Sequence, residues 1–124
     1  MKSKSILLLE PDKSIATSVK DYLALNQYVT TQAHTAEEAI ALADKGTYSC
    51  IVMELVLGAH SGIEFLHEFH SYGDLAKVPV IIFTSQLMQN NNAFNNLGVK
   101  EYLYKPNTSL LKLLESINKH VNNS

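Results

Sequence analysis

The sequence predicts an α/β fold in which five parallel strands form one doubly wound sheet. Five short apolar runs recur along the chain, and stretches with helical periodicity separate them. The third run, residues 49–55, is nearly continuous in apolar residues, as expected for a central parallel strand covered by helices on both faces. Right-handed crossovers between these strands place helices on both sides of the sheet. We therefore expect the strand order 2-1-3-4-5 with five helices.

Size and composition indicate a single domain spanning residues 1–124. A chain of 124 residues with 46% hydrophobic content can bury one core, and its lone cysteine, Cys50, lies inside an apolar run as a buried structural thiol would. The 10 basic and 12 acidic side chains give a net charge of −2 without a basic patch, so we expect no nucleic-acid binding. Only about four apolar residues follow the amino-terminal lysines, too few for a signal peptide or membrane span. We expect a cytosolic protein without membrane contact.

The first half of the chain carries clear strand and helix signals. A strand at 6–9 leads into Asp12, which is placed to cap a helix at 13–25, and a second strand follows at 28–31. The next two helices each begin with the spacing of a capping box, Thr35 with Glu38 and Ser61 with Glu64. Gly46 is expected to end the helix that begins after Thr35. Residues 49–55 are expected to form the third strand, between this helix and the one that begins after Ser61.

The second half contains the least certain element. A fourth strand is expected at 80–83, a fifth at 102–104 before Pro106, and a last amphipathic helix at 110–121. The asparagine-rich segment 86–97 is expected to form only a short, weakly held helix, because asparagine is a poor helix former. Its apolar residues available for packing are Leu87, Met88, Phe94 and Leu97.

Four of the five strands end on a residue that can carry chemistry: Glu10, Glu54, Thr84 and Lys105. Ligands of such sheets gather outside the carboxyl ends of the strands, at the point where the strand order reverses. The flavodoxin-like order 2-1-3-4-5 places strand 3 beside strand 1. It therefore predicts that Glu10 and Glu54 meet there, with Thr84 and Lys105 on the neighbouring strand ends.

Four segments in this order resemble the receiver domain of bacterial two-component response regulators, over essentially the whole chain: residues 6–12, 51–58 with Ser61 and Gly62, 81–85, and 101–106. In that family the third strand ends in an aspartate that accepts a phosphoryl group from a histidine kinase. Paired acids after the first strand help to bind magnesium, a threonine and a lysine contact the phosphoryl group, and an aromatic residue on the fifth strand reports the change. The resemblance implies these roles for the matching positions of this chain.

The matching positions are Glu54 for the phosphoacceptor, Thr84 and Lys105 for the phosphate pocket, Tyr102 for the switch aromatic, and Glu10 for the first member of the acidic pair. The chain is thus an atypical variant, since glutamate carries its carboxylate about 1.5 Å farther from the backbone than aspartate does. A pocket shaped for phosphoryl transfer to aspartate would then be out of register.

The acidic pair is also incomplete. Pro11 stands where the second acid would be, and Gly58 replaces the usual proline after the third strand. Magnesium requires near-octahedral oxygen coordination, which Glu10 and Glu54 alone supply poorly, so we expect weak or absent Mg²⁺ binding and no other cofactor. Asp12 is a possible substitute ligand in the acidic pocket, although capping the following helix is the favoured role.

These departures suggest a receiver module that signals through protein contacts without aspartyl phosphorylation and has no enzymatic activity. Glu54 would mimic a phosphoryl group only in part, because a carboxylate carries one charge against about 1.5 to 2. An ion pair with Lys105 partly open to solvent would contribute about 0 to 1 kcal/mol. A complete two-state switch needs about 5.5 kcal/mol, so partner contacts would also be required.

Candidate partners are a histidine kinase, an output domain or a second receiver, bound on the face formed by the fourth helix, fifth strand and fifth helix. Tyr102, Tyr104, Lys112 and Lys119 are candidates for that face. Other interpretations stay open: a receiver still phosphorylated or metal-binding at a non-standard site, and a residual ion cluster that only stabilises the strand ends. A flavodoxin-like FMN-binding domain is a further alternative, but it would need a Gly- or Ser/Thr-rich loop after the first strand.

Overall fold

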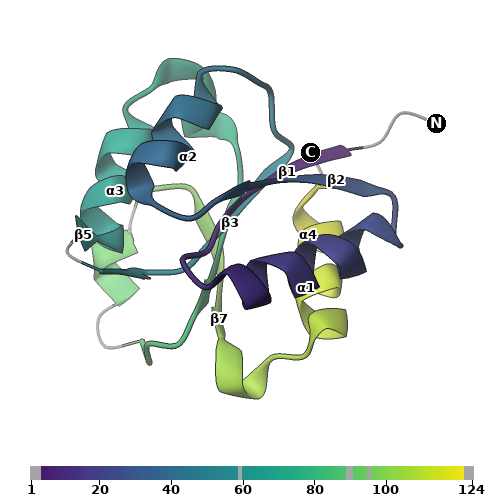
Figure 1. Cartoon of the computed structure of the whole chain (residues 1–124). Helices are drawn as coiled ribbons and strands as arrows, with labels where there is room; N and C mark the ends of the chain where they lie inside the picture. The colour runs from purple at the N-terminus through teal and green to yellow at the C-terminus, as the bar shows by residue number, and fades with distance from the viewer. Residues whose placement is uncertain (1–3, 59, 89–90, 95, 122–124) are drawn as a thin grey trace.

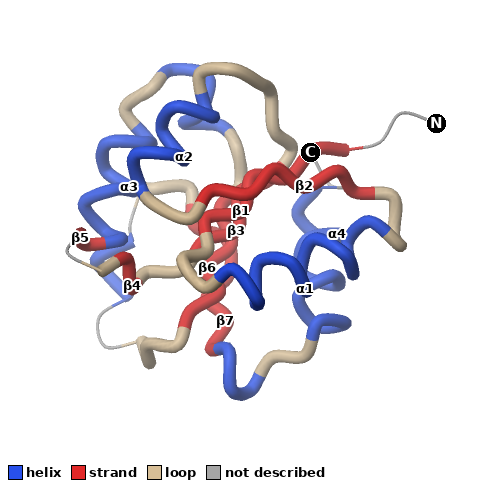
Figure 2. The backbone as a smooth tube through the Cα atoms, in the orientation of Figure 1, coloured by secondary structure: helices blue, strands red, loops and turns tan. Residues whose placement is uncertain are grey.

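The computed structural model describes residues 4–58, 60–88, 91–94 and 96–121. Five parallel strands form its central sheet in the order β2-β1-β3-β6-β7 (Figure 2). Their bounds are Lys4–Leu9 (β1), Tyr28–Ala33 (β2), Cys50–Met53 (β3), Val80–Thr84 (β6) and Val99–Tyr104 (β7). The predicted fold class is confirmed, and within this sheet the five strands follow the predicted order.

Helices cover both faces of the sheet. The α-helices are Lys13–Ala24 (α1), Ala36–Ala43 (α2), Gly62–His70 (α3) and Leu110–Val121 (α4). Figure 1 shows α1 and α4 on one side and α2 and α3 on the other. Each side has its own core, because alternate residues of the central strands point to opposite faces: Leu8 packs toward α1 and α4, whereas Leu7 packs toward α2 and α3. None of the described helices is long and apolar enough to cross a bilayer.

The side chains predicted to cap the helices do so. Asp12 accepts hydrogen bonds from the backbone amides of Ser14 and Ile15 at 2.9 and 3.1 Å. Thr35 accepts from the Glu38 amide at the start of α2, and Ser61 accepts likewise from the Glu64 amide at the start of α3. Cys50 is buried as predicted, and burial raises the pKa of its thiol to about 12. These local signals were sufficient because each bond joins residues only a few positions apart.

The helix count is a correction. The described residues form four α-helices rather than five, and the segment expected to form the fourth helix contains a 3-10 helix at Asn91–Phe94 (η2). Residues 89, 90 and 95 lie outside the described part of the chain. Leu87 and Met88, which were expected to pack, are 61% and 44% exposed, and Asn96 adopts a positive φ of 65°. Asparagine tolerates this left-handed backbone, which no α-helix contains.

A short antiparallel hairpin was not predicted. Strands β4 (Val56–Leu57) and β5 (His60–Ser61) pair with each other, so the central sheet uses the first, second, third, sixth and seventh strands along the chain. Gly58 lies between them with a φ of 69°, an angle that the ring of a proline excludes. The third strand is accordingly shorter than expected and ends at Met53. Glu54 and Leu55 lie outside the ladder, directly before the hairpin.

Candidate functional site

The carboxyl ends of the parallel strands bring together the four predicted side chains Glu10, Glu54, Thr84 and Lys105. Glu10 follows β1 and Glu54 follows β3, and these strands pair in register up to Leu9 and Met53. Thr84 is the last residue of β6, and Lys105 follows β7 at the start of a short 3-10 helix, Lys105–Asn107 (η3). Glu10, Glu54 and Thr84 are 3%, 4% and 0% exposed. We call these four side chains the carboxylate cluster. Most of the carboxylate cluster is buried and not solvent-exposed.

One oxygen of the Glu54 carboxylate binds its own loop and the neighbouring strand end. Oε2 accepts hydrogen bonds from the backbone amides of Leu55 and Val56, at 2.6 and 3.0 Å. The Thr84 hydroxyl also donates to Oε2. Such local bonds from a side chain to the following amides give the backbone an alternative to the strand ladder, and β3 ends at this point.

The other oxygen of Glu54 binds the same strand end, after β6, and one further strand end, after β7. Oε1 accepts from Lys105 Nζ at 2.8 Å, from the Ser85 amide at 3.0 Å and from the Ser85 hydroxyl at 3.3 Å. Six donors thus surround one carboxylate, whose two oxygens offer about four lone-pair sites. Ser85 was not recognised as a site residue from the sequence; its position directly after Thr84 was the available signal.

Lys105 bridges two carboxylates. Its Nζ lies 2.6 Å from Glu10 Oε1 and 2.8 Å from Glu54 Oε1, and its side chain is 15% exposed. Burial lowers the pKa of Lys105, but the carboxylates of Glu10 and Glu54 outweigh this effect and raise the pKa above its usual 10.5. The ammonium is therefore charged at neutral pH and acts as the counter-ion of both acids.

Glu54 is ionised despite its burial. Burial alone raises the pKa of the Glu54 carboxyl, but hydrogen bonds from Lys105, Thr84 and backbone amides outweigh it and hold the pKa at about 2, against a usual 4.5. The ion pair is partly open to solvent only on the lysine side: the Lys105 side chain is 15% exposed and that of Glu54 is 4% exposed. Glu54 is covered because the hairpin and the loop after β6 both fold onto its carboxylate through the amides of Val56 and Ser85.

Asp12 lies beside the cluster without joining it. Its carboxylate caps α1, and its backbone amide donates to Glu10 Oε2 at 3.0 Å. Glu10 therefore uses one oxygen for Lys105 and the other for the Asp12 amide. The structure favours the capping role of Asp12 over a place in the acidic pocket.

A chain of hydrogen bonds joins Glu54 to Tyr102. The Thr84 hydroxyl donates to Glu54 and accepts from the Gln86 amide at 3.1 Å. The Gln86 carbonyl in turn accepts from the Tyr102 hydroxyl at 2.6 Å. The Tyr102 ring also packs against Phe94 in η2, with ring centroids 5.7 Å apart. Tyr102 on β7 is thus connected to the carboxylate cluster through the loop that follows β6.

Comparison with known proteins assigns the family. A family model described as the response regulator receiver domain matches residues 6–118. The chain belongs to this family. A receiver domain protein (CheY-like) from Methanospirillum hungatei JF-1 is 25% identical and superposes with a TM-score of 0.89, covering 98% of this chain and 95% of that one. The family match and the structural likeness together show the receiver fold and a role in two-component signalling.

Curated relatives of this receiver domain are longer proteins. The transcriptional regulatory protein CiaR of Streptococcus pneumoniae is 34% identical over 103 residues, which are 82% of this chain and 44% of CiaR. The probable transcriptional regulator ycf29 of Porphyra purpurea is 29% identical over 105 residues, 84% of this chain and 50% of that protein. The chain spans about half the length of these relatives.

The side-chain oxygens at this site do not fit the magnesium ion that the family implies. Pro11 supplies no side-chain oxygen, and Asp12 uses its carboxylate as a helix cap. Both oxygens of Glu54 and both oxygens of Glu10 already accept hydrogen bonds, and Lys105 places its ammonium between the two acids. Among the described residues, no group of three His, Cys, Asp or Glu side chains could hold a metal ion. The arrangement of these side chains does not fit the octahedral shell of oxygen ligands that Mg²⁺ prefers.

Proposed function

We propose that this receiver domain is a protein-binding signalling module, and not an enzyme, in which Glu54 takes the place of the phosphorylated residue. The observation that carries the proposal is the set of six donors around the Glu54 carboxylate. They include the threonine and lysine that match the phosphate-contacting positions of the family. A negative charge, smaller than that of a phosphoryl group, is thus permanently present among these donors, and it sets the conformation without a kinase.

The chemistry of the carboxylate also disfavours phosphorylation of Glu54 itself. A nucleophile attacks with a free lone pair, and hydrogen bonds from an ammonium, a hydroxyl and amides withdraw electron density from both oxygens. Lys105 further occupies the position between Glu10 and Glu54 where a divalent cation would be needed. In this proposal Lys105 replaces the metal and Glu54 replaces the phosphoryl group, so the module needs no cofactor.

Phosphorylation of the purified chain tests the proposal. With acetyl phosphate and Mg²⁺, we expect no acyl phosphate on the unaltered chain, as measured by intact-protein mass and a phosphate-affinity gel. Glu54→Asp shortens the side chain and should recover only partial phosphorylation, because Pro11 still provides no metal ligand. The double variant Pro11→Asp with Glu54→Asp should be phosphorylated more fully than Glu54→Asp alone.

Two outcomes would count against this proposal. A stable acyl phosphate on the unaltered chain would show that Glu54 or a neighbouring acid is still a phosphoacceptor. Full phosphorylation of the single Glu54→Asp variant would show that the metal ligand at position 11 is dispensable.

The partner surface belongs to the same proposal. Glu54 holds the loop after β6, and the exposed residues Leu87 and Met88 continue that loop toward η2. On the last helix, Leu111 is 55% exposed. We place the contact with a histidine kinase, an output domain or a second receiver on the face formed by η2, β7 and α4, within a cytosolic pathway. This is the face that Tyr102 joins to the carboxylate cluster.

The coupling between Glu54 and this face can be measured by hydrogen exchange. Thr84→Val removes the donor to Glu54 and the acceptor for the Gln86 amide while keeping the side-chain shape. A hydrogen bond to a charged group contributes about 1.5–3 kcal/mol, so the Ser85 and Gln86 amides should exchange at least about ten-fold faster.

Thr30→Val is the matched control for this measurement. The Thr30 hydroxyl is buried and has no hydrogen-bond partner among the described residues, so its loss should leave exchange in residues 84–88 unchanged. Equal exchange rates in Thr84→Val and in the unaltered chain would contradict the coupling.

A further inference from the structure

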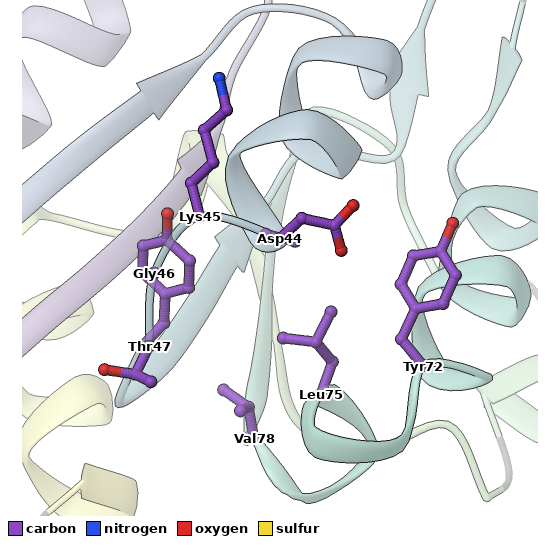
Figure 3. A pocket seen from close by; sticks show the side chains of 9 residues that line it. Asp44, Lys45, Gly46, Thr47, Tyr72, Leu75 and Val78 are labelled. Carbon is purple, nitrogen blue, oxygen red and sulfur yellow. The ribbon is translucent and has the colours of Figure 1, made fainter.

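Two hollows lie beside α2 and α3, on the side of the sheet away from α1 and α4. One hollow of about 740 Å³ lies between the loop after α2 and the segment after α3 (Figure 3). A second hollow of about 300 Å³ lies between α2 and α3. The two hollows are neighbours, because the Tyr72 hydroxyl at the first donates to Glu68 Oε2 at the second at 3.2 Å. We call the surface that carries both hollows the α2–α3 groove.

The floor of the α2–α3 groove is apolar. Ile40 and Phe65 line the smaller hollow, and Leu75 and Val78 line the larger one. Phe65 is part of the core beneath, and the other three are partly buried against that core. A floor anchored in this way is preformed, so a ligand would bind without first ordering it.

The rim of the α2–α3 groove is acidic. Glu37 and Asp44 come from the α2 side, and Glu64 and Glu68 come from α3. Glu64 and Glu68 lie four residues apart on one face of α3, and Tyr72, beyond the end of the helix, donates its hydroxyl to Glu68 Oε2. Figure 3 shows the Asp44 carboxylate turned toward Tyr72 across the hollow, with Leu75 below it, while the Lys45 ammonium points away.

We propose that the α2–α3 groove binds a basic amphipathic helix of a partner protein. Apolar side chains of that helix would cover Ile40, Phe65 and Leu75, and its lysine or arginine side chains would pair with the acids on the rim. The helix-in-groove mode needs an apolar floor, and the excess of acids over the single lining lysine specifies a basic partner. This surface is separate from the face joined to Glu54, so the chain would bind a second protein independently of the proposed signalling state.

The test uses the whole chain and a synthetic probe. The probe is a fluorescein-labelled peptide of about 15 residues, long enough to form a helix, with leucine on one face and lysine and arginine beside it. We expect saturable binding by fluorescence anisotropy that weakens as salt is raised. Amide chemical shifts should change along α2, α3 and residues 72–78.

Two matched charge variants separate the α2–α3 groove from general attraction. The double variant Glu64→Gln with Glu68→Gln should weaken binding at least about five-fold, since it removes two rim charges. The control Asp21→Asn with Glu115→Gln removes the same charge from exposed positions on α1 and α4 and should change affinity less than about two-fold. A peptide of equal charge with glutamine in place of leucine should bind at least about ten-fold more weakly.

Three results would overturn this inference. Equal weakening by both double variants would show non-specific attraction to an acidic protein. Undiminished binding of the glutamine peptide would show that the apolar floor takes no part. Concentration-dependent dimerisation with shifts in the α2–α3 groove would show that a second copy of the chain, and not a basic helix, occupies it. Each result leaves the Glu54 proposal standing, because no variant used here touches the carboxylate cluster.

Discussion

Replacing Lys105 with methionine is expected to lower the free energy of unfolding by about 3–5 kcal/mol, the cost of leaving a buried ion pair without one partner. Methionine keeps the length of the side chain but removes the ammonium that lies 2.6 and 2.8 Å from the carboxylates of Glu10 and Glu54. Both acids are at most 4% exposed, so water is a poor replacement for the lost cation. Urea denaturation at neutral pH measures the loss.

The control for this variant is Lys112→Met, at an exposed position on α4. It should change the free energy of unfolding by less than about 0.5 kcal/mol. Adding Glu54→Gln to Lys105→Met should recover part of the loss, since one of the two unpaired charges is then removed. A loss below about 1 kcal/mol in Lys105→Met would mean that the ammonium is not the main counter-ion of the cluster.

The second large effect is expected in the acid range, between pH 4.5 and about 2. The pKa of Glu54 is about 2 in the folded protein against a usual 4.5. A carboxyl whose pKa is lowered by folding stabilises the protein above its unfolded pKa, and this contribution is lost as the pH falls toward the folded pKa. A difference of about 2.5 pKa units corresponds to about 3 kcal/mol, lost between pH 4.5 and 2.

Comparison with Glu54→Gln isolates this contribution. The amide cannot ionise and cannot accept from all six donors, so the variant should be about 3 kcal/mol less stable than the unaltered chain at pH 6, and this deficit should shrink steadily as the pH falls to 2. Carboxyls away from the cluster are common to both proteins and cancel in the difference. Glu115→Gln, at an exposed position, should run parallel to the unaltered chain throughout. Parallel curves for Glu54→Gln would show that Glu54 has an ordinary pKa.

Local signals accounted for much of the fold. Asp12, Thr35 and Ser61 were assigned as helix caps because the amides they bind lie within three residues in the sequence. The asparagine-rich segment was expected to form a short α-helix, and this was wrong: its described residues contain only the 3-10 helix Asn91–Phe94, because asparagine is a poor helix former. The hairpin of β4 and β5 was missed because two strands of two residues leave no periodicity to detect.

The candidate site, too, was predicted from the sequence only in part. The position of Glu10, Glu54, Thr84 and Lys105 at neighbouring strand ends followed from the order of strands and helices. The role of Ser85 and the burial of the ion pair did not follow from it. Ser85 and Lys105 reach Glu54 from 31 and 51 residues away, and the geometry of such contacts depends on how the loops after β3 and β6 pack.

The sequence by itself determined that the protein is a doubly wound α/β domain with an acid-rich strand edge, because hydrophobic period and helix caps are local properties. It also determined that position 54 carries a glutamate and position 11 no acid. Only the tertiary structure decided that the carboxylate of Glu54 turns inward and meets six donors, and that Lys105 lies between the two acids. These contacts depend on the juxtaposition of strand ends distant in sequence, which only folding brings within hydrogen-bond distance.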